Sequence, residues 1–293
     1  MIKNIIVKEP LNKIDSDWLP YNWDLNIYRG CSHTCRYCYA LYSHKYLESE
    51  NFFGDIFVKT NIAQALDRKL SSKSWRGEII NLGGVTDSYQ QIEKQNLIMR
   101  DILKVMIKHR NPICISTKSE LILRDIDLFC ELASYTKVNI AVTITTTDEA
   151  LQKIIEPGAS SPKKRFEILE QFSKTKISTG LHLMPILPFI SDNKSSLEDI
   201  FSNARKANCN YVITAVLNLR GDTKTNYLKF IEQKFPDLIS KYTSLYKSSF
   251  VTKEYNKSLY KEINLLKRKY HYFNEHELEQ IKEKLIEQLD LDL

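Results

Sequence analysis

The segment Tyr28-Arg-Gly-Cys-Ser-His-Thr-Cys-Arg-Tyr-Cys-Tyr39 places three cysteines, Cys31, Cys35 and Cys38, within eight residues. Thiolates are soft ligands that suit zinc or iron–sulfur clusters. In a long chain, crowded cysteines indicate metal ligands before they indicate disulfide bridges. One tight loop can bind three irons of a cubane and has no fourth thiolate to offer. The spacing therefore predicts a metal centre with one coordination position left open.

The sequence around this segment alternates between short β-branched runs and longer helical patterns. Such alternation predicts parallel βαβ units with helices outside. The strands are expected at residues 25–29, 78–82, 113–117, 138–145, 177–184 and 211–217, and the helices near 61–71, 93–109, 120–133, 163–173 and 196–207. We expect Ser196 and Asp199 to form a capping box at the last of these helices. The pattern indicates an α/β protein, a partial (β/α)6 barrel with its functional groups at the carboxyl ends of the strands. A doubly wound open sheet is the alternative, which periodicity alone does not exclude.

After about residue 221 the sequence predicts helices only, near 223–248, 253–270 and 275–289. We therefore divide the chain into a barrel, residues 1–220, and a helical extension packed on it, residues 221–293. Residues 224–270 hold eleven Lys and Arg against four Asp and Glu, with tyrosines interleaved. Cations neutralise phosphates and aromatic rings stack on bases, so nucleic acid is one partner that this stretch allows. A solvated helix face is the simpler interpretation.

Composition limits the class of protein further. The chain has 293 residues, 43% of them hydrophobic, and a formal net charge of +6. This is enough apolar material for one large core. No apolar run approaches the roughly 20 residues that a membrane span needs, and the first residues lack the pattern of a signal peptide. We expect a cytoplasmic protein with no membrane partner.

The spacing Cys-x3-Cys-x2-Cys, with Tyr37 before the last cysteine, resembles the signature of the radical S-adenosylmethionine (SAM) superfamily. The resemblance implies a 4Fe–4S cluster on Cys31, Cys35 and Cys38 whose open iron is chelated by SAM. It also implies reductive cleavage of SAM to a 5′-deoxyadenosyl radical, and an electron donor such as flavodoxin or ferredoxin. Further segments resemble the branch of spore photoproduct lyases and DNA repair photolyase-like proteins. They are residues 26–31, 83–89, 116–119, 156–160 with Arg165, and 184–187.

This resemblance implies a set of residues that contact SAM. Backbone at Gly83 and Gly84 is expected to meet the amino group of the methionine part, and the hydroxyl of Thr86 to face the ligand. Lys118 is expected to bind the carboxylate of SAM. Thr143 stands where the branch has a hydroxyl that faces the ribose or the methionine part.

Four other positions complete the expected site. Met184, and also Tyr37, are expected to offer backbone groups to the adenine. Arg165 either clamps Glu156 or reaches the carboxylate of SAM, since charged pairs of this kind serve both roles. Tyr39 matches a tyrosine of the lyases' radical relay and is the one candidate catalytic residue.

The sequence departs from the lyases at one position that matters. They carry a hydrogen-donating cysteine two residues before the position of Thr86, where this chain has Gly84. We therefore expect radical chemistry on an unidentified substrate, with nucleic acid, a peptide and a small metabolite as the alternatives. From a different class, the chain fits a non-catalytic iron–sulfur or zinc binding module, with His33 or His44 as a fourth ligand to zinc.

The remaining cysteines are predicted to be structural, because free cysteine behaves as a small buried hydrophobe. Cys130 is expected on an apolar helix face and Cys209 just before a strand. Cys114 shares strand parity with Lys118, so its side chain is expected on the same side of the sheet. His33 is expected to be an ordinary loop residue.

Overall fold

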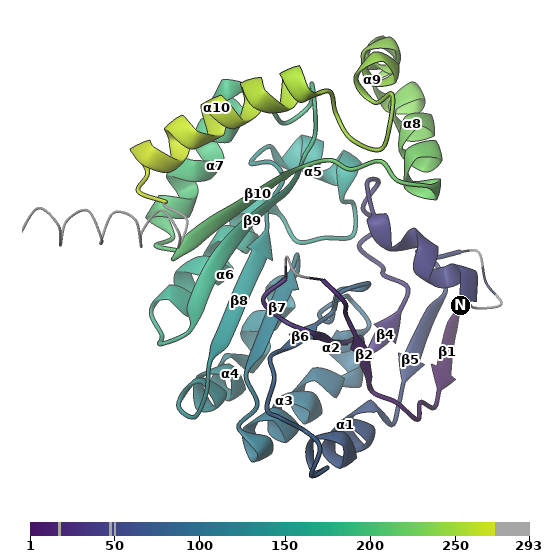
Figure 1. The fold of residues 1–293 in the computed structure, drawn as a ribbon, viewed down its shortest axis with the longest axis vertical. Helices are drawn as coiled ribbons and strands as arrows, with labels where there is room; N and C mark the ends of the chain where they lie inside the picture. The colour runs from purple at the N-terminus through teal and green to yellow at the C-terminus, as the bar shows by residue number, and fades with distance from the viewer. Residues whose placement is uncertain (17–18, 47–48, 50, 273–293) are drawn as a thin grey trace, which may run out of the picture.

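The computed structural model describes residues 1–16, 19–46, 49 and 51–272 (Figure 1). A seven-stranded sheet has the order β10-β9-β8-β7-β6-β3-β2, and a three-stranded sheet has the order β1-β5-β4. The strands are β1 Ile2–Ile5, β2 Leu11–Lys13, β3 Trp23–Leu25, β4 Tyr28–Arg29, β5 Ile56–Lys59, β6 Ile80–Leu82, β7 Ile113–Thr117, β8 Val138–Thr143, β9 Ser178–Ile186 and β10 Tyr211–Val216.

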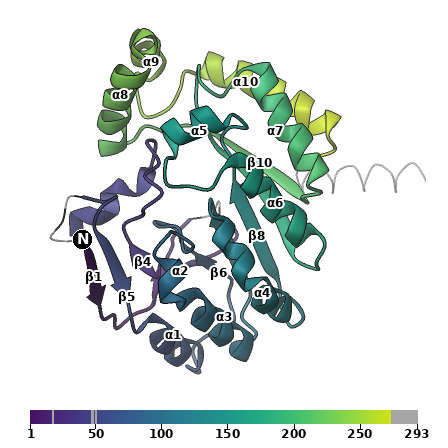
Figure 2. The same ribbon diagram turned by 180° about the vertical axis from the view of Figure 1, so that it is seen from behind.

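The helices alternate with these strands. They are η1 Tyr39–Tyr46, α1 Ile62–Leu70, α2 Glu93–Asn96, α3 Ile98–His109, η2 Glu120–Asp125, α4 Ile126–Ala133, α5 Glu149–Ile155, α6 Pro162–Ser173, α7 Lys194–Lys206, α8 Asp222–Lys234, η3 Pro236–Leu238, α9 Ile239–Leu245 and α10 Lys253–Lys269, where η denotes a 3₁₀ helix. Seen from behind, α3, α4 and α6 lie in front of the large sheet (Figure 2). The apolar faces of these helices pack on the strands in one continuous core.

The strand order confirms the partial barrel. From β3 to β10 every neighbouring pair in the large sheet is parallel, and the strands follow one another in sequence order. A doubly wound sheet reverses direction at a switch point. This sheet instead proceeds in one direction, as a barrel does. Only β2, at the edge, runs antiparallel to its neighbour.

The expected strand at 25–29 is wrong as a single element. The chain leaves the large sheet after Leu25 and enters the small one at Tyr28. In the small sheet β4 pairs antiparallel with β5. The apolar pattern runs through both pieces, so it does not show that the strand changes partners. The cysteine loop therefore begins at the junction of the two sheets.

Two expected helices are interrupted, and one cap is wrong. The helix expected at 93–109 is broken at Leu97, which has a φ of 54°. The pattern at 120–133 forms η2 followed by α4. The capping box at Ser196 and Asp199 does not form. The helix starts earlier, and the Asn193 side chain accepts a hydrogen bond of 2.9 Å from the Ser196 backbone N–H.

The C-terminal helices pack at two places: α8 contacts η1, and α10 lies against α7 (Figure 1). The helix expected at 223–248 ends before Pro236, which lacks the N–H that a helix interior needs, and α9 follows. Three of the tyrosines are buried here and hydrogen-bonded, among them Tyr242 to the Pro188 carbonyl and Tyr246 to the Leu217 carbonyl. The third, Tyr227, packs with them, so none of the three is free to stack on a base.

The division at residue 220 stays a prediction, although α10 belongs to the same core as the barrel. The helix expected at 275–289 lies outside the described residues. Within the described parts of the chain, no helix is long and apolar enough to cross a membrane.

Candidate cofactor site

The cysteine loop follows β4 and is held by backbone hydrogen bonds. The Cys31 N–H donates to the Phe52 carbonyl at 3.2 Å, and the Cys38 N–H donates to the Cys35 carbonyl at 3.1 Å. All three thiols are free of disulfides. Burial raises the pKa of Cys31 to about 12 and raises the pKa of Cys35 and Cys38 as well. The thiolate form therefore needs a positive partner such as iron.

His33, inside this loop, is not an ordinary loop residue. Its Nδ1 lies 2.9 Å from the Gly158 carbonyl and its Nε2 lies 2.9 Å from the Asp87 carboxylate, and the ring is buried. A Cβ on Gly158 would lie 2.1 Å from the Ser32 carbonyl, so only glycine permits this close approach. Because both ring nitrogens of His33 are engaged, the ring is not available as a zinc ligand.

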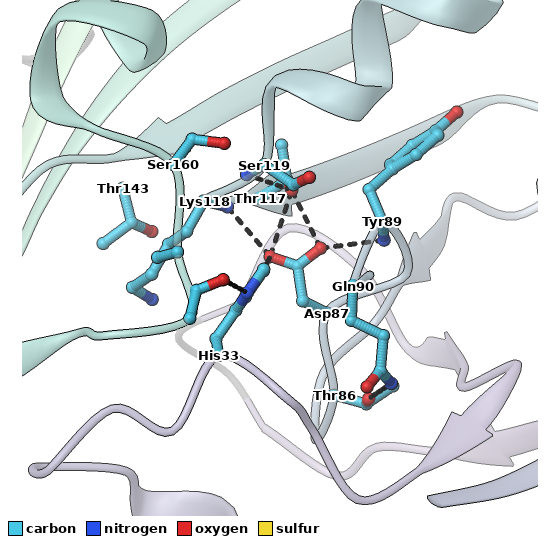
Figure 3. A network of polar contacts seen from close by, with 12 residues as sticks. His33, Thr86, Asp87, Tyr89, Gln90, Thr117, Lys118, Ser119, Thr143 and Ser160 are labelled. Atoms are coloured by element: carbon cyan, nitrogen blue, oxygen red, sulfur yellow. Dashed lines mark hydrogen bonds and ion pairs between the residues drawn. The ribbon is translucent and has the colours of Figure 1, made fainter. Parts of the chain in front are cut away.

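Asp87 is the centre of the network in Figure 3. Its carboxylate accepts hydrogen bonds from the Thr117 hydroxyl and from the backbone N–H groups of Lys118 and Tyr89, each at 2.8 Å. Burial alone would raise the pKa of Asp87, but His33 and these donors hold it well below its usual range. The carboxylate thus joins the cysteine loop to the ends of β6 and β7.

Thr86 makes a second hydrogen-bonded contact with the residues that precede the cysteine loop. Its hydroxyl donates to the Gly30 carbonyl at 2.6 Å, and Gln90 donates to the Thr86 hydroxyl at 3.0 Å and to the same carbonyl at 3.1 Å. The expected contact of this hydroxyl with SAM stays a prediction, because the proton is already donated within the protein. Gly83 precedes it at a φ of 92°, which favours glycine.

Lys118 lies at the end of β7 and projects toward Thr143 in Figure 3. In the described part of the chain no carboxylate lies within 4 Å of its ammonium, which stands 5.8 Å from the centre of the Tyr37 ring. Burial would lower the pKa of Lys118, but the nearby Cys35 and Glu156 raise it. A charged ammonium without a carboxylate partner therefore lies beside the cysteine loop.

Arg165 is fully buried and takes the first of its two expected roles, the clamp. Its Nη2 lies 2.5 Å from the Glu156 carboxylate, and its other groups donate to the Ser160 carbonyl at 2.7 Å and the Thr143 carbonyl at 3.0 Å. The Tyr37 hydroxyl also donates to Glu156. Burial would raise the pKa of Glu156, but Arg165 and Lys118 lower it.

Thr143 and Met184 lie toward the same edge of the sheet. The Thr143 hydroxyl is 3.3 Å from that of Ser116, which is 3.3 Å from Nδ1 of His182. Burial, with the charge of Lys118, lowers the pKa of His182 to about 4, so the ring is neutral at pH 7. Met184 is in β9, which extends to Ile186.

The other side of the site, at Gly84 and Tyr39, is built differently. The Gly84 N–H donates to the Asp24 carboxylate at 3.0 Å, and Asn81 and Asn26 donate to the same carboxylate at 2.9 and 2.5 Å. A Cβ on Gly84 would lie 2.4 Å from an Asp24 oxygen. Asp24 therefore fills the space that any side chain at position 84 would need. The Tyr39 hydroxyl donates to the Gly84 carbonyl.

The three remaining cysteines lie apart from the loop. Cys114 donates to Asn81 at 3.5 Å, and burial raises its pKa to about 12. Cys209 is buried beside the hydroxyl of Tyr272. The expectation for Cys130 is wrong, because this residue is exposed. Its helix α4 turns a different face to the core.

Several site residues were missed in the sequence. Asp24, Asn26 and Asn81 are buried polar residues beside apolar strand positions. Asp24 and Asn26 are two residues apart at the end of β3, and this spacing places both side chains on one side of an extended chain. That pattern was a usable signal. The pairing of His33 with Asp87 joins residues 54 positions apart and needed the structure.

A single metal ion and a four-iron cluster place different demands on the three cysteines. Within the described ranges no three His, Cys, Asp or Glu side chains are close enough to hold a single metal ion. A cubane makes a different demand, since each thiolate binds a different iron. The loop offers three free thiols beside the unpaired ammonium of Lys118, and these residues fit the cluster together with an anionic ligand.

Fold and site together define a partial-barrel protein with three clustered thiols at the carboxyl edge of its parallel strands. A family model described as the radical SAM superfamily matches residues 25–202, and the chain belongs to this superfamily. The family implies an iron–sulfur cluster and SAM.

The chain is similar to proteins of distant organisms. It is 31% identical over 277 residues to an uncharacterized protein of Mycobacterium tuberculosis. This alignment covers 93% of this chain and 82% of the relative. It is 30% identical over 236 residues to an uncharacterized protein of Methanocaldococcus jannaschii. This alignment covers 80% of this chain and 84% of the relative.

Among solved structures, the fold is similar to spore photoproduct lyase complexed with dinucleoside spore photoproduct. The TM-score is 0.67 at 14% identity, covering 91% of this chain and 79% of the other. A mutant of the lyase with bound AdoMet and the dinucleoside gives a TM-score of 0.60 at 15% identity, covering 88% and 76%. This similarity shows the fold.

Proposed function

We propose that the chain is an enzyme that holds a 4Fe–4S cluster on Cys31, Cys35 and Cys38 and acts on nucleic acid. The bound cluster would supply one electron to cleave SAM to a 5′-deoxyadenosyl radical, which abstracts a hydrogen atom from the substrate. The observation that carries this proposal is the free ammonium of Lys118 beside three free thiols at one edge of the barrel.

The residues around the thiols would orient SAM. Lys118 would pair with its carboxylate, since a charge-assisted hydrogen bond to a buried ammonium favours an anion there. The backbone of Gly83 and Gly84 would accept from its amino group, with the hydroxyls of Thr86 and Thr143 nearby. Met184 would present its backbone to the adenine.

Arg165 and Glu156 would act as positioning residues. Arg165 uses its donors on Glu156 and on two backbone carbonyls, so it would hold the ends of β8 and the 156–160 loop in register. Glu156 in turn accepts from Tyr37, the residue before the last cysteine. The pair would fix the cysteine loop against the barrel without touching the substrate.

Nucleic acid is supported as the substrate by two features. The lyase of similar fold was solved with a dinucleoside, and residues 224–270 carry a large excess of Lys and Arg. The stacking argument is weaker, because Tyr227, Tyr242 and Tyr246 are buried. The substrate we propose is not spore photoproduct, because Asp24 fills the space of the lyases' hydrogen-donating side chain.

The test is transfer of deuterium. Reconstituted, reduced enzyme would be incubated with SAM and single-stranded DNA or RNA that is deuterated in its sugars and bases. The proposal predicts deuterium in the 5′-deoxyadenosine that forms. Unlabelled 5′-deoxyadenosine with every nucleic acid, together with label from deuterated peptides or metabolites, would assign the same chemistry to another substrate class.

Tyr39 would be the catalytic residue nearest the substrate. Its hydroxyl donates to the Gly84 carbonyl at the open side of the loop, and the residue is 63% exposed. Tyr39→Phe should leave cluster content unchanged and slow substrate turnover. Normal turnover in this variant would remove Tyr39 from the reaction.

A further inference from the structure

A group of cations and polar atoms, of which Lys59 is buried and Arg29 half-buried, lies between η1 and the small sheet. In the small sheet Arg29 is directly opposite Phe57, and Lys59 follows Phe57 by two residues. Side chains at these positions share one face of a sheet. The 3₁₀ helix η1 covers this face, since the ring of His44 lies 5.8 Å from that of Phe57. Figure 1 shows the small sheet beside the large one.

Lys59 is 5% exposed and unpaired. Among the described residues, no carboxylate lies within ion-pair distance of its ammonium, and no acceptor is hydrogen-bonded to it. Burial and the nearby charge of Arg29 lower the pKa of Lys59 to about 8, so most molecules still carry this charge at pH 7. An isolated buried charge is costly unless a partner neutralises it.

The residues around Lys59 also lack partners, although Arg29 is only half-buried. The guanidinium of Arg29 has one contact, a hydrogen bond of 3.4 Å to the Ser43 carbonyl, and no carboxylate partner in the described chain. The Ser43 hydroxyl and Nδ1 of His44 are buried and have no hydrogen-bond partner among the described residues. Buried polar atoms are nearly always paired in folded proteins, so these two unpaired atoms, beside the buried Lys59 and the half-buried Arg29, indicate a missing ligand.

The neighbouring carboxylates do not supply that ligand. Asp55 is paired with the amino terminus at 2.9 Å and with the Ser49 hydroxyl at 2.6 Å. Asp24, whose charge Lys59 feels, already accepts from Asn26, Asn81 and Gly84. The layer therefore keeps two cations and a free hydroxyl that no anion of the described chain satisfies.

We propose that this layer between η1 and the small sheet binds a phosphate group. Lys59 and Arg29 would neutralise its charge and the Ser43 hydroxyl would donate to it. Two cations match a group that carries up to two negative charges better than they match one carboxylate. The group is either inorganic phosphate or a phosphate of a nucleic-acid strand. The site is close to the cysteine loop in sequence, since Arg29 precedes Cys31 by two residues and η1 begins after Cys38.

The experiment is thermal unfolding of the cluster-loaded full chain, with potassium chloride at matched ionic strength as the reference. Three ligands would be titrated: inorganic phosphate, a short single-stranded oligonucleotide with a 5′-phosphate, and the same strand without it. We expect at least one to raise the midpoint by roughly 2–4 °C near saturation. A shift with phosphate alone identifies a free ion, and a shift with either strand identifies a nucleic-acid phosphate.

The variant Lys59→Met removes the charge at similar volume and should lose this shift. Arg29→Gln serves in its place if Lys59→Met does not fold. The matched control is Lys104→Met, whose exposed ammonium pairs with Asp101, and it should respond as the parent does. No shift in the parent with any of the three ligands, or an undiminished shift in the folded variant, overturns the proposal. The readout needs no turnover, so it is independent of the proposed catalytic function.

Discussion

The edge of the barrel around the cysteine loop, which we call the rim, has two sides that are held together by different kinds of groups. On the side of β7 to β9, Lys118, Glu156 and Arg165 form a charged group that closes on the cysteine loop through Tyr37. On the side of β3 and β6, Asp24 is held by amides and fills the space next to Gly84. The first side has what binding a charged cofactor requires. The second has a carboxylate beside Gly84, the position at which the resemblance implies a thiol in the lyases.

The largest effect is expected at the cysteines. Cys31→Ala, Cys35→Ala or Cys38→Ala should each abolish the cluster, because two thiolates anchor a cubane poorly. Anaerobic reconstitution of the parent should give about four irons and four sulfides per chain. Cys114→Ala, Cys130→Ala and Cys209→Ala are the matched controls and should keep the cluster. Stoichiometric zinc without iron uptake in the parent would contradict the assignment.

Substitutions on the charged side should lower the free energy of unfolding most. Glu156→Gln leaves the Arg165 guanidinium buried without its counter-ion, which should lower the free energy of unfolding by about 3–5 kcal/mol. Denaturant unfolding measures this directly. The matched control is Glu170→Gln, which breaks the exposed pair with Lys174 and should change little. Equal effects of the two variants would show that the buried pair does not hold this side together.

Lys118 should affect SAM binding and not the cluster. Lys118→Met removes a charged hydrogen bond worth about 1.5–3 kcal/mol, so the KM for SAM should rise roughly 10–100-fold. Iron content and the visible spectrum should match those of the parent. Lys104→Met, at an exposed helix position, is the control. An unchanged KM would remove Lys118 from the SAM site.

The other side should show a smaller, steric effect. Gly84→Ala forces a Cβ toward Asp24 and should cost about 1–3 kcal/mol of stability. Asp24→Gly in the same chain should recover part of that loss, because it removes the oxygen 2.4 Å away. For the same reason Gly84→Cys alone should not gain lesion repair. The double variant Asp24→Gly with Gly84→Cys tests whether the removal of this oxygen permits lesion repair. In the stability measurements, simple additivity of the effects of Gly84→Ala and Asp24→Gly would exclude the steric conflict.

The sequence predicted the parts of the fold that depend on local pattern. The strand at Ile113–Thr117 was correct in both bounds, because its apolar alternation begins and ends with its pairing. Residues 25–29 were misread because strand pairing is a tertiary property, and the same apolar run serves two sheets. The gathering of Lys118 and Thr143 near the cysteine loop followed from the rule that parallel strands end at one edge.

The contacts between distant residues needed the structure. His33 with Asp87 and Asp24 with Gly84 join loops whose approach depends on the whole barrel. The strand that ends at Lys59 was not predicted from the sequence, and only the structure shows that this charge is buried without an ion pair. The hydrophobic period of a strand does not show whether a polar side chain finds a partner.

The central claim is that this rim holds a cluster which cleaves SAM. The most direct measurement is the yield of 5′-deoxyadenosine from SAM with anaerobically reconstituted, chemically reduced protein. The account predicts 5′-deoxyadenosine and methionine in equal amounts from the parent chain, and none from Cys35→Ala. A fully cluster-loaded, reduced parent that yields no 5′-deoxyadenosine, with or without nucleic acid, would contradict it.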